Sequence, residues 1–243
     1  MKLFLTSSPS GALDQPNDDR LLDNTNGFVD QLKTLWKKEM KGLMIAADPE
    51  DFSGNDEMTA FFTDAFNHSG LPILGFKLWD YRSQEINPEI LMQSNFIMLA
   101  GGHLPTQNTF FHQINLSSLL YGYQGVVIGV SAGTMNCANE VYVMPEMPSE
   151  AIDPNFKRFS NGLGLTEINV LPHYQLVRDM VVDGLRLYEE IIYPDSHGKR
   201  FFALPDGSYI VCDEKGKRLY GEGYLVQNGI IRQISFLNHW IEL

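Results

Sequence analysis

The stretch "GVVIGVSAGT" (residues 125–134) places a serine directly after an apolar run. The run predicts a buried strand that ends near Ser131, and the small residues after it predict a sharp turn into a helix. Strand packing alone does not call for a hydroxyl group at this position. The rest of the sequence must therefore provide either a partner that activates Ser131 or a structural reason for it, such as capping the helix.

Four earlier apolar runs resemble this one, and near-continuous apolarity is typical of strands covered on both faces of a parallel sheet. They are residues 3–8, 43–48, 73–80 and 96–102. Helices are predicted between the runs, over residues 26–39, 55–68, 87–94 and 105–121. Asn55 and Asp56 are expected to cap the second helix, and Gly70 to end it. This alternation of strand and helix predicts an open α/β sheet.

The composition of the sequence changes after residue 140. Residues 141–166 are rich in proline, methionine and polar residues and predict an irregular segment over the edge of the sheet. A strand is expected over 167–174 and a helix over 176–193. The remaining chain alternates turn signals with β-prone runs, which predicts antiparallel ribbons. Because the sequence contains no linker or repeat, we expect one domain over residues 1–243.

Composition excludes several classes of function. The chain has 243 residues and a net charge of −12, from 18 Lys and Arg against 30 Asp and Glu. Such an acidic chain would repel phosphate backbones, so nucleic acid is not expected as a partner. Cys137 and Cys212 cannot form a disulfide framework or a four-thiolate zinc site, and no other spacing resembles a metal site. The sequence also has no 18-residue apolar run and no signal-peptide pattern, so a cytoplasmic protein without membrane contact, cofactor or metal is expected.

A serine nucleophile needs a base, and the position of His173 makes it the best of the six histidines. It follows the run "INVLP" and should emerge at the end of a strand, where open α/β sheets gather their sites. His103 also follows a predicted strand and could line the same cleft. Structural roles are expected for the other histidines, which are His68, His112, His197 and His239.

A third group would have to orient the histidine, and four acidic residues are available for this role. Glu140 lies nine residues after Ser131 along the predicted helix, about 2.5 turns away, so its side chain should project far from the serine. Glu146, Glu150 and Asp153 remain. Pro145 and Pro148 should hold the loop around Glu146 rigid, but spacing alone does not choose among the three.

Five segments in order resemble a known family, the serine peptidases that include dipeptidase E (aspartyl dipeptidase) and cyanophycinase. The segments are "FIMLAGG…NTF", "GVVIGVSAGTMNCA", "MPEMP", "INVLPHY" and "ALPDGSYI", spread over residues 96–211. The resemblance implies a flavodoxin-like, class I glutamine amidotransferase-like fold. In that fold a three-layer sandwich surrounds a mostly parallel sheet, here with antiparallel strands at the C-terminus.

Carried over by position, the resemblance implies that Ser131 is the nucleophile and His173 the base. The family's acid lies 15 residues after its serine, which implies Glu146 and a Ser-His-Glu triad. The oxyanion hole would then consist of the backbone N–H of Ala132 and one from Gly101 or Gly102.

Two departures from the family pattern concern the substrate. The compact "GGGNTF" of dipeptidase E is extended here to "GGHLPTQNTF", which brings His103 toward the expected cleft. An aspartyl substrate also needs a cationic partner, for which Arg178 and Arg186 are the nearest candidates. They lie eight residues apart on similar faces of the predicted helix, but the local sequence does not match the family, so aspartyl specificity does not carry over.

The resemblance thus implies a serine peptidase of exopeptidase type that hydrolyses short peptides, and a homodimer is one assembly that the sequence allows. Two alternatives remain open at the level of sequence. One is an esterase or amidase that acts on small acyl compounds. The other is a binding protein of the same fold, in which Ser131 only caps a helix.

Overall fold

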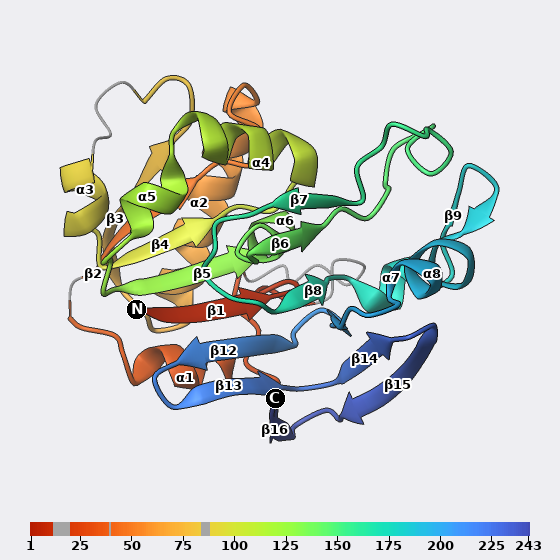
Figure 1. Ribbon diagram of the computed structural model, residues 1–243. Coiled ribbons are helices and arrows are strands. Elements are labelled where there is room, and N and C mark those ends of the chain that lie inside the picture. Colours follow the sequence, from red (N-terminus) through yellow and green to blue (C-terminus); the bar gives the residue numbers. More distant parts are fainter. Residues whose placement is uncertain (12–19, 39, 84–87) are drawn as a thin grey trace.

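The computed structural model describes residues 1–11, 20–38, 40–83 and 88–243, and an eight-stranded sheet lies at its centre (Figure 1). The strand order is β16-β13-β12-β1-β5-β4-β2-β3, and the five strands from β1 to β3 in this order are parallel. These five are β1 (Lys2–Thr6), β2 (Met40–Ile45), β3 (Ile73–Trp79), β4 (Phe96–Leu99) and β5 (Val126–Val130). Each lies within or overlaps a predicted apolar run, so the expected mostly parallel sheet is confirmed.

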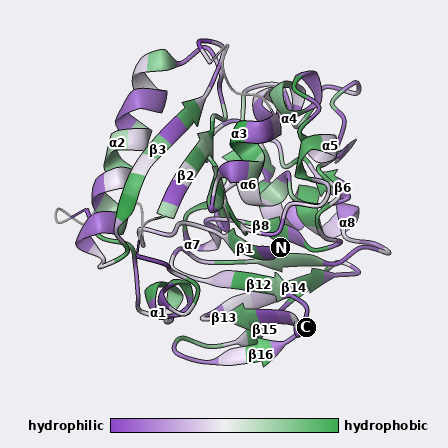
Figure 2. Ribbon diagram, turned by 90° about the vertical axis from the view of Figure 1, so that its left-hand side faces the viewer, coloured by the Kyte–Doolittle hydropathy of each residue, from purple (hydrophilic) through white to green (hydrophobic). Residues whose placement is uncertain are grey.

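Helices cover both faces of the sheet (Figures 1 and 2). One face packs against α1 (Phe28–Lys33) and α2 (Phe52–His68), and the other against α3 (Pro88–Gln93), α4 (Leu104–Gln113) and α5 (Leu116–Leu120). Neighbouring strand residues point to opposite faces. Phe4 accordingly packs in the core with α1 and α2, and Leu5 in the core with α4 and α5. The result is the expected three-layer sandwich.

Three helices differ from the predictions. Helix α1 ends at Lys33, whereas a helix was predicted over 26–39. Helix α2 is capped by Asp51, whose carboxylate accepts a hydrogen bond from the N–H of Gly54. Asn55 therefore lies inside the helix, where its side chain donates to the carbonyl of Asp48. The helix predicted over 105–121 is divided at Asn115, whose φ of 51° is left-handed, a conformation that asparagine tolerates well.

The C-terminal part is antiparallel, as predicted. Strands β12 (Tyr209–Asp213), β13 (Gly216–Tyr220) and β16 (Trp240–Glu242) extend the central sheet beyond β1. A four-stranded sheet has the order β15-β14-β11-β8, and only its β11–β8 pair is parallel. Its strands are β8 (Asn169–Leu171), β11 (Phe201–Ala203), β14 (Gly223–Gln227) and β15 (Ile230–Ser235).

Short elements connect the two sheets. They are α6 (Ala132–Met135), the paired β6 (Glu140–Tyr142) and β7 (Phe159–Asn161), α7 (Tyr174–Val177), β9 (Val181–Val182), β10 (Leu185–Arg186), the π-helical segment η1 (Leu187–Ile192) and α8 (Tyr193–Asp195). The prediction of a single helix over 176–193 is therefore wrong. Asp183 and Gly184 have φ of 52° and 84° and form the two-residue turn of the β9–β10 hairpin. Asp-Gly is a typical dipeptide for such a turn, and it interrupts the helical pattern.

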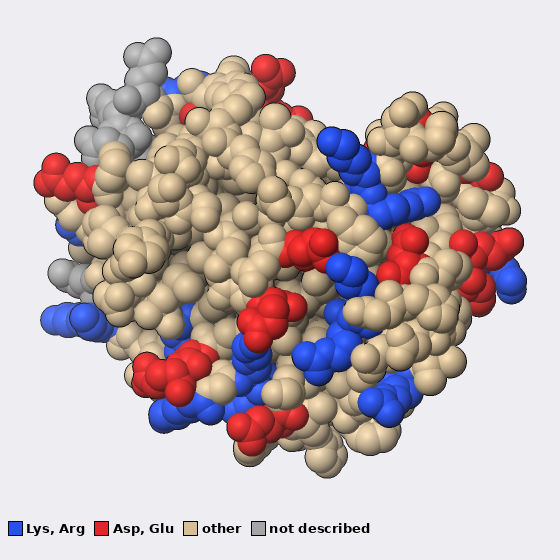
Figure 3. Space-filling model, in the orientation of Figure 1, with Lys and Arg blue, Asp and Glu red and all other residues tan. Residues whose placement is uncertain are grey.

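The surface of the molecule carries charges of both signs. On the face shown in Figure 3, basic and acidic side chains are interspersed over the C-terminal half. In the ranges that the structure describes, no helix has the length and apolarity needed to cross a membrane.

Candidate active site

The chain makes a strained turn where β5 ends and α6 begins. Ser131 lies in this turn with φ of 49° and ψ of −112°, a sparsely populated conformation for a residue with a side chain. Its N–H points back to the end of β1, where the carbonyl oxygens of Thr6 and Ser7 lie 3.2 and 3.1 Å away. The turn presents the Ser131 hydroxyl at the carboxyl end of the parallel sheet, as a nucleophile elbow does.

The glycines on either side of Ser131 allow α6 to approach the sheet closely. A Cβ at Gly129 would lie 2.7 Å from Cα of Thr134, and one at Gly133 would lie 2.2 Å from the carbonyl oxygen of Leu99. Both distances are shorter than van der Waals contact. The G-x-S-x-G pattern is therefore a steric requirement of this turn.

We expect Gly133→Ala to destabilise the fold by about 3 kcal/mol, because the backbone of β4 would have to move to accommodate the methyl group. Gly75→Ala is the control, since a Cβ at this exposed position of β3 meets no atom within 4 Å. The free energy of unfolding, measured by urea titration, should fall in the first variant only. Equal values for the two variants would contradict the steric argument.

His173 lies directly beside the serine. It follows β8, as predicted, and its Nε2 is 2.8 Å from Oγ of Ser131. Its backbone is left-handed, with φ of 57°, and its N–H donates to Oγ of Ser7 over 2.7 Å. The imidazole is thus fixed from the backbone as well as through its ring.

Asp206, rather than the predicted Glu146, contacts the other ring nitrogen. Its Oδ1 lies 2.7 Å from Nδ1 of His173, and its side chain is fully buried. The pairing of β8 with β11 explains this arrangement, because Leu171 and Ala203 are register partners in parallel strands. His173 and Asp206 follow these partners by two and three residues, so both emerge at the same end of the sheet.

The Asp206 carboxylate is held in its ionised form. Burial acts to raise its pKa, but hydrogen bonds outweigh burial and lower the pKa below the ordinary value. His173 is the largest of these contributions, followed by Ser7, which donates to Oδ1 over 2.7 Å, and Gln175, whose Nε2 donates to Oδ2 over 2.6 Å. Gln175 also accepts the backbone N–H of Asp206.

Ser7, at the end of β1, contacts Ser131, His173 and Asp206. Its carbonyl accepts from Ser131, and its buried hydroxyl accepts from the His173 backbone and donates to Asp206. Neither Ser7 nor Asp206 was predicted from the sequence. Asp206 lies within "ALPDGSYI", a segment that resembles the family, between a proline and a glycine that indicate a turn. Ser7 gave no signal beyond its place at the end of an apolar run.

Gly101 and Ala132, two of the residues predicted to form the oxyanion hole, lie close to Ser131. A Cβ at Gly101 would lie 3.4 Å from Cβ of Ser131, and one at Gly102 only 2.6 Å from Cβ of Ala47. Ala132 is the first residue of α6. Among the described residues, none accepts a hydrogen bond from the N–H of Gly101, Gly102 or Ala132.

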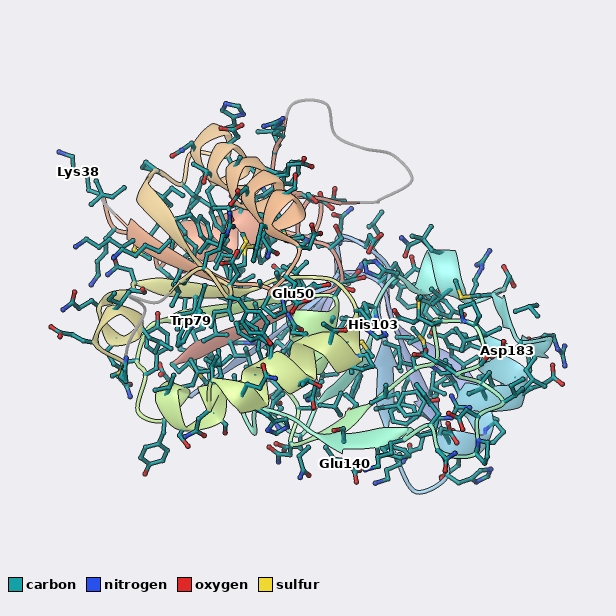
Figure 4. The ribbon with its side chains drawn as sticks, turned by 90° about the horizontal axis from the view of Figure 1, so that it is seen from above. Lys38, Glu50, Trp79, His103, Glu140 and Asp183 are labelled. Carbon is teal, nitrogen blue, oxygen red and sulfur yellow. The ribbon has the colours of Figure 1, made fainter. Side chains whose placement is uncertain are left out.

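A cleft of about 1000 Å³ opens beside Ser131 and His173, and Glu146 is one of the residues that line it. His103, at the start of α4 (Figure 4), is not among the described residues that line the cleft, contrary to expectation. Its Nδ1 lies 2.8 Å from Oγ1 of Thr106 and its Nε2 3.6 Å from Oε1 of Glu150. The part of the chain described here contains no cluster of three or more potential metal ligands.

Arg178 and Arg186 are not among the described residues that line the cleft, contrary to expectation. Arg178 follows α7 and pairs with Asp179. Arg186 lies in β10 and pairs with Glu190. The two arginines therefore belong to different elements, because the Asp183–Gly184 turn separates them.

Comparison with known proteins agrees with the fold. The model of peptidase family S51 matches residues 45–220. The fold is similar to that of a peptidase from an acI-B1 Actinobacterium, with a TM-score of 0.64 and 15% identity over 100% of this chain and 96% of that one. It is also similar to a candidate peptidase E from Listeria monocytogenes EGD-e, with a TM-score of 0.56 and 16% identity over 96% and 98%. No protein with a curated description matches the sequence. The family match covers most of the chain and includes Ser131, His173 and Asp206, so the chain belongs to peptidase family S51.

Proposed function

We propose that this protein is a serine peptidase that hydrolyses short peptides through a triad of Ser131, His173 and Asp206. The proposal rests chiefly on two short contacts in series, 2.8 Å from Ser131 Oγ to His173 Nε2 and 2.7 Å from His173 Nδ1 to Asp206 Oδ1. Such a series activates a hydroxyl that is otherwise a weak nucleophile. Asp206 has the role of the acid that orients His173, which the family resemblance implied for Glu146.

Each residue has a defined role in the proposed reaction. Ser131 Oγ forms a bond to the peptide carbonyl carbon while His173 Nε2 accepts the hydroxyl proton. The backbone N–H groups of Ala132 and of Gly101 or Gly102 stabilise the oxyanion. His173 then returns the proton to the leaving amine, and a water molecule cleaves the acyl-enzyme by the same route. Asp206 keeps Nδ1 protonated and stabilises the imidazolium.

The function is tested by incubating the protein with a library of di- and tripeptides and a set of small esters. Ser131→Ala serves as the blank for every substrate. We expect peptide cleavage that is absent from the blank. Ester turnover that exceeds every peptide would favour an esterase, and binding of a peptide without turnover would favour a binding protein.

We further expect Ser7 to act as a positioning residue. Ser7→Ala removes a donor to Asp206 and the acceptor of the His173 N–H, so kcat should fall about 10- to 100-fold while KM changes little. The NMR resonance of the proton between His173 and Asp206 should also shift. Ser94→Ala is the control, because Ser94 is a buried serine that donates to a backbone carbonyl of α3. An unchanged kcat in Ser7→Ala would refute this role.

A further inference from the structure

Apolar side chains from separate parts of the chain line the cleft beside Ser131. They are Met58, Phe61 and Phe62 of α2, Met144 after β6, and Val177 and Met180 from the region of α7. These side chains offer no hydrogen bond to a charged group on a substrate. Contact with an apolar side chain of a substrate would instead be favourable, since it removes apolar surface from water.

Glu146 lines the same cleft, and its side chain is exposed there. Within the described chain its carboxylate has no hydrogen bond or ion pair, whereas the neighbouring Glu150 accepts the backbone N–H groups of Glu146 and Met147 and lies near His103. Partial desolvation in the cleft raises the pKa of Glu146, although His103 and His173 act in the opposite direction. A cation that entered the cleft would meet a carboxylate that is accessible and that no described side chain pairs with.

The charges of the cleft do not favour an acidic substrate. Its charged lining residues include Glu57, Glu146 and Arg20, and Arg20 is paired with Asp64 over 2.7 Å. An aspartyl side chain would therefore lie among apolar groups and carboxylates, with Arg20, which is already paired with Asp64, as the arginine among the described lining residues.

Resting on the proposed function, we infer that the cleft selects short peptides in which an ammonium group lies beside an apolar side chain. Glu146 is the partner of the ammonium group, and the apolar lining residues cover the side chain. The ammonium group can come from the peptide's N-terminus or from a lysine side chain, which the experiment below distinguishes.

The test compares kcat/KM for four substrates, Leu-Leu, Asp-Leu, N-acetyl-Leu-Leu and N-acetyl-Lys-Leu. We expect Leu-Leu to exceed Asp-Leu by about tenfold or more, and to exceed N-acetyl-Leu-Leu by about 10- to 100-fold. Rapid cleavage of N-acetyl-Lys-Leu would identify the lysine side chain as the source of the ammonium group, and slow cleavage would identify the N-terminus.

Two variants assign the effect to a residue. Glu146→Gln should abolish the discrimination against the acetylated peptide, whereas Glu57→Gln, the matched change elsewhere in the cleft, should preserve it. Unchanged discrimination in Glu146→Gln, equal loss in Glu57→Gln, or preference for Asp-Leu would overturn the inference.

A binding measurement separates this inference from the proposed function. Titration calorimetry on the Ser131→Ala protein should give tighter binding of Leu-Leu than of N-acetyl-Leu-Leu, and the difference should disappear in Ser131→Ala/Glu146→Gln. If the wild type cleaves no peptide but this difference is found, the peptidase proposal fails and the selectivity stands. If peptides are cleaved and the difference is absent, the selectivity fails alone.

Discussion

Ser131→Ala is expected to lower kcat for peptide hydrolysis by about 10⁴- to 10⁶-fold, the largest effect of any single change in this chain. The substitution removes the only atom that forms the covalent intermediate in the proposed reaction. His173 and Asp206 keep their own contact, because neither needs the serine hydroxyl for it. The residual rate would come from the oxyanion groups and from substrate binding.

The measurement is a single-turnover assay on a peptide that the wild type cleaves. Thermal unfolding of the variant is the control, and its midpoint should match that of the wild type because alanine and serine experience the same strain at φ of 49°. Ser131→Gly should unfold at a higher temperature, since glycine adopts a positive φ without that strain, and should be equally inactive. A variant that retained a tenth of the wild-type kcat would remove Ser131 from the reaction.

Local patterns in the sequence predicted the parallel sheet well. The inner strands β4 and β5 are uninterrupted apolar runs, because helices cover both faces of the sheet there, whereas the edge strand β3 contains Lys77 and is largely exposed. Ser131 and His173 could be selected in the same way, since each lies just beyond the end of such a run. The structure brings these two residues within hydrogen-bond distance.

The acid could not be found by local reasoning. Asp206 reaches His173 only because β11 pairs with β8. The register partners Leu171 and Ala203 lie 32 positions apart in the chain, so this contact is not local. The resemblance to the family implied Glu146, which lines the cleft but does not contact Nδ1 of His173. Two carboxylates near one histidine can be told apart only when the sheet pairing is known.

Comparison of Asp206→Asn with Glu146→Gln tests that distinction. Asp206→Asn should lower kcat by about 10³- to 10⁴-fold, because the amide cannot stabilise the imidazolium and favours the wrong tautomer of His173. Glu146→Gln should leave kcat near the wild-type value and act on KM for substrates with an ammonium group. The reverse result would restore Glu146 as the acid and reduce Asp206 to a structural carboxylate.

The pH dependence of stability tests independently whether the Asp206 carboxylate is ionised in the folded protein. Its pKa is lowered in the folded protein, so its ionised form stabilises the fold above the ordinary carboxyl pKa, and this stability is lost as the pH falls through the lowered value. The free energy of unfolding of Asp206→Asn should therefore lie below that of the wild type at neutral pH, and the gap should narrow as the pH falls. A gap that stayed constant in acid would show that the hydrogen bonds from His173, Ser7 and Gln175 do not depend on the charge of Asp206. The ionised carboxylate required by the proposed reaction would then have no energetic support.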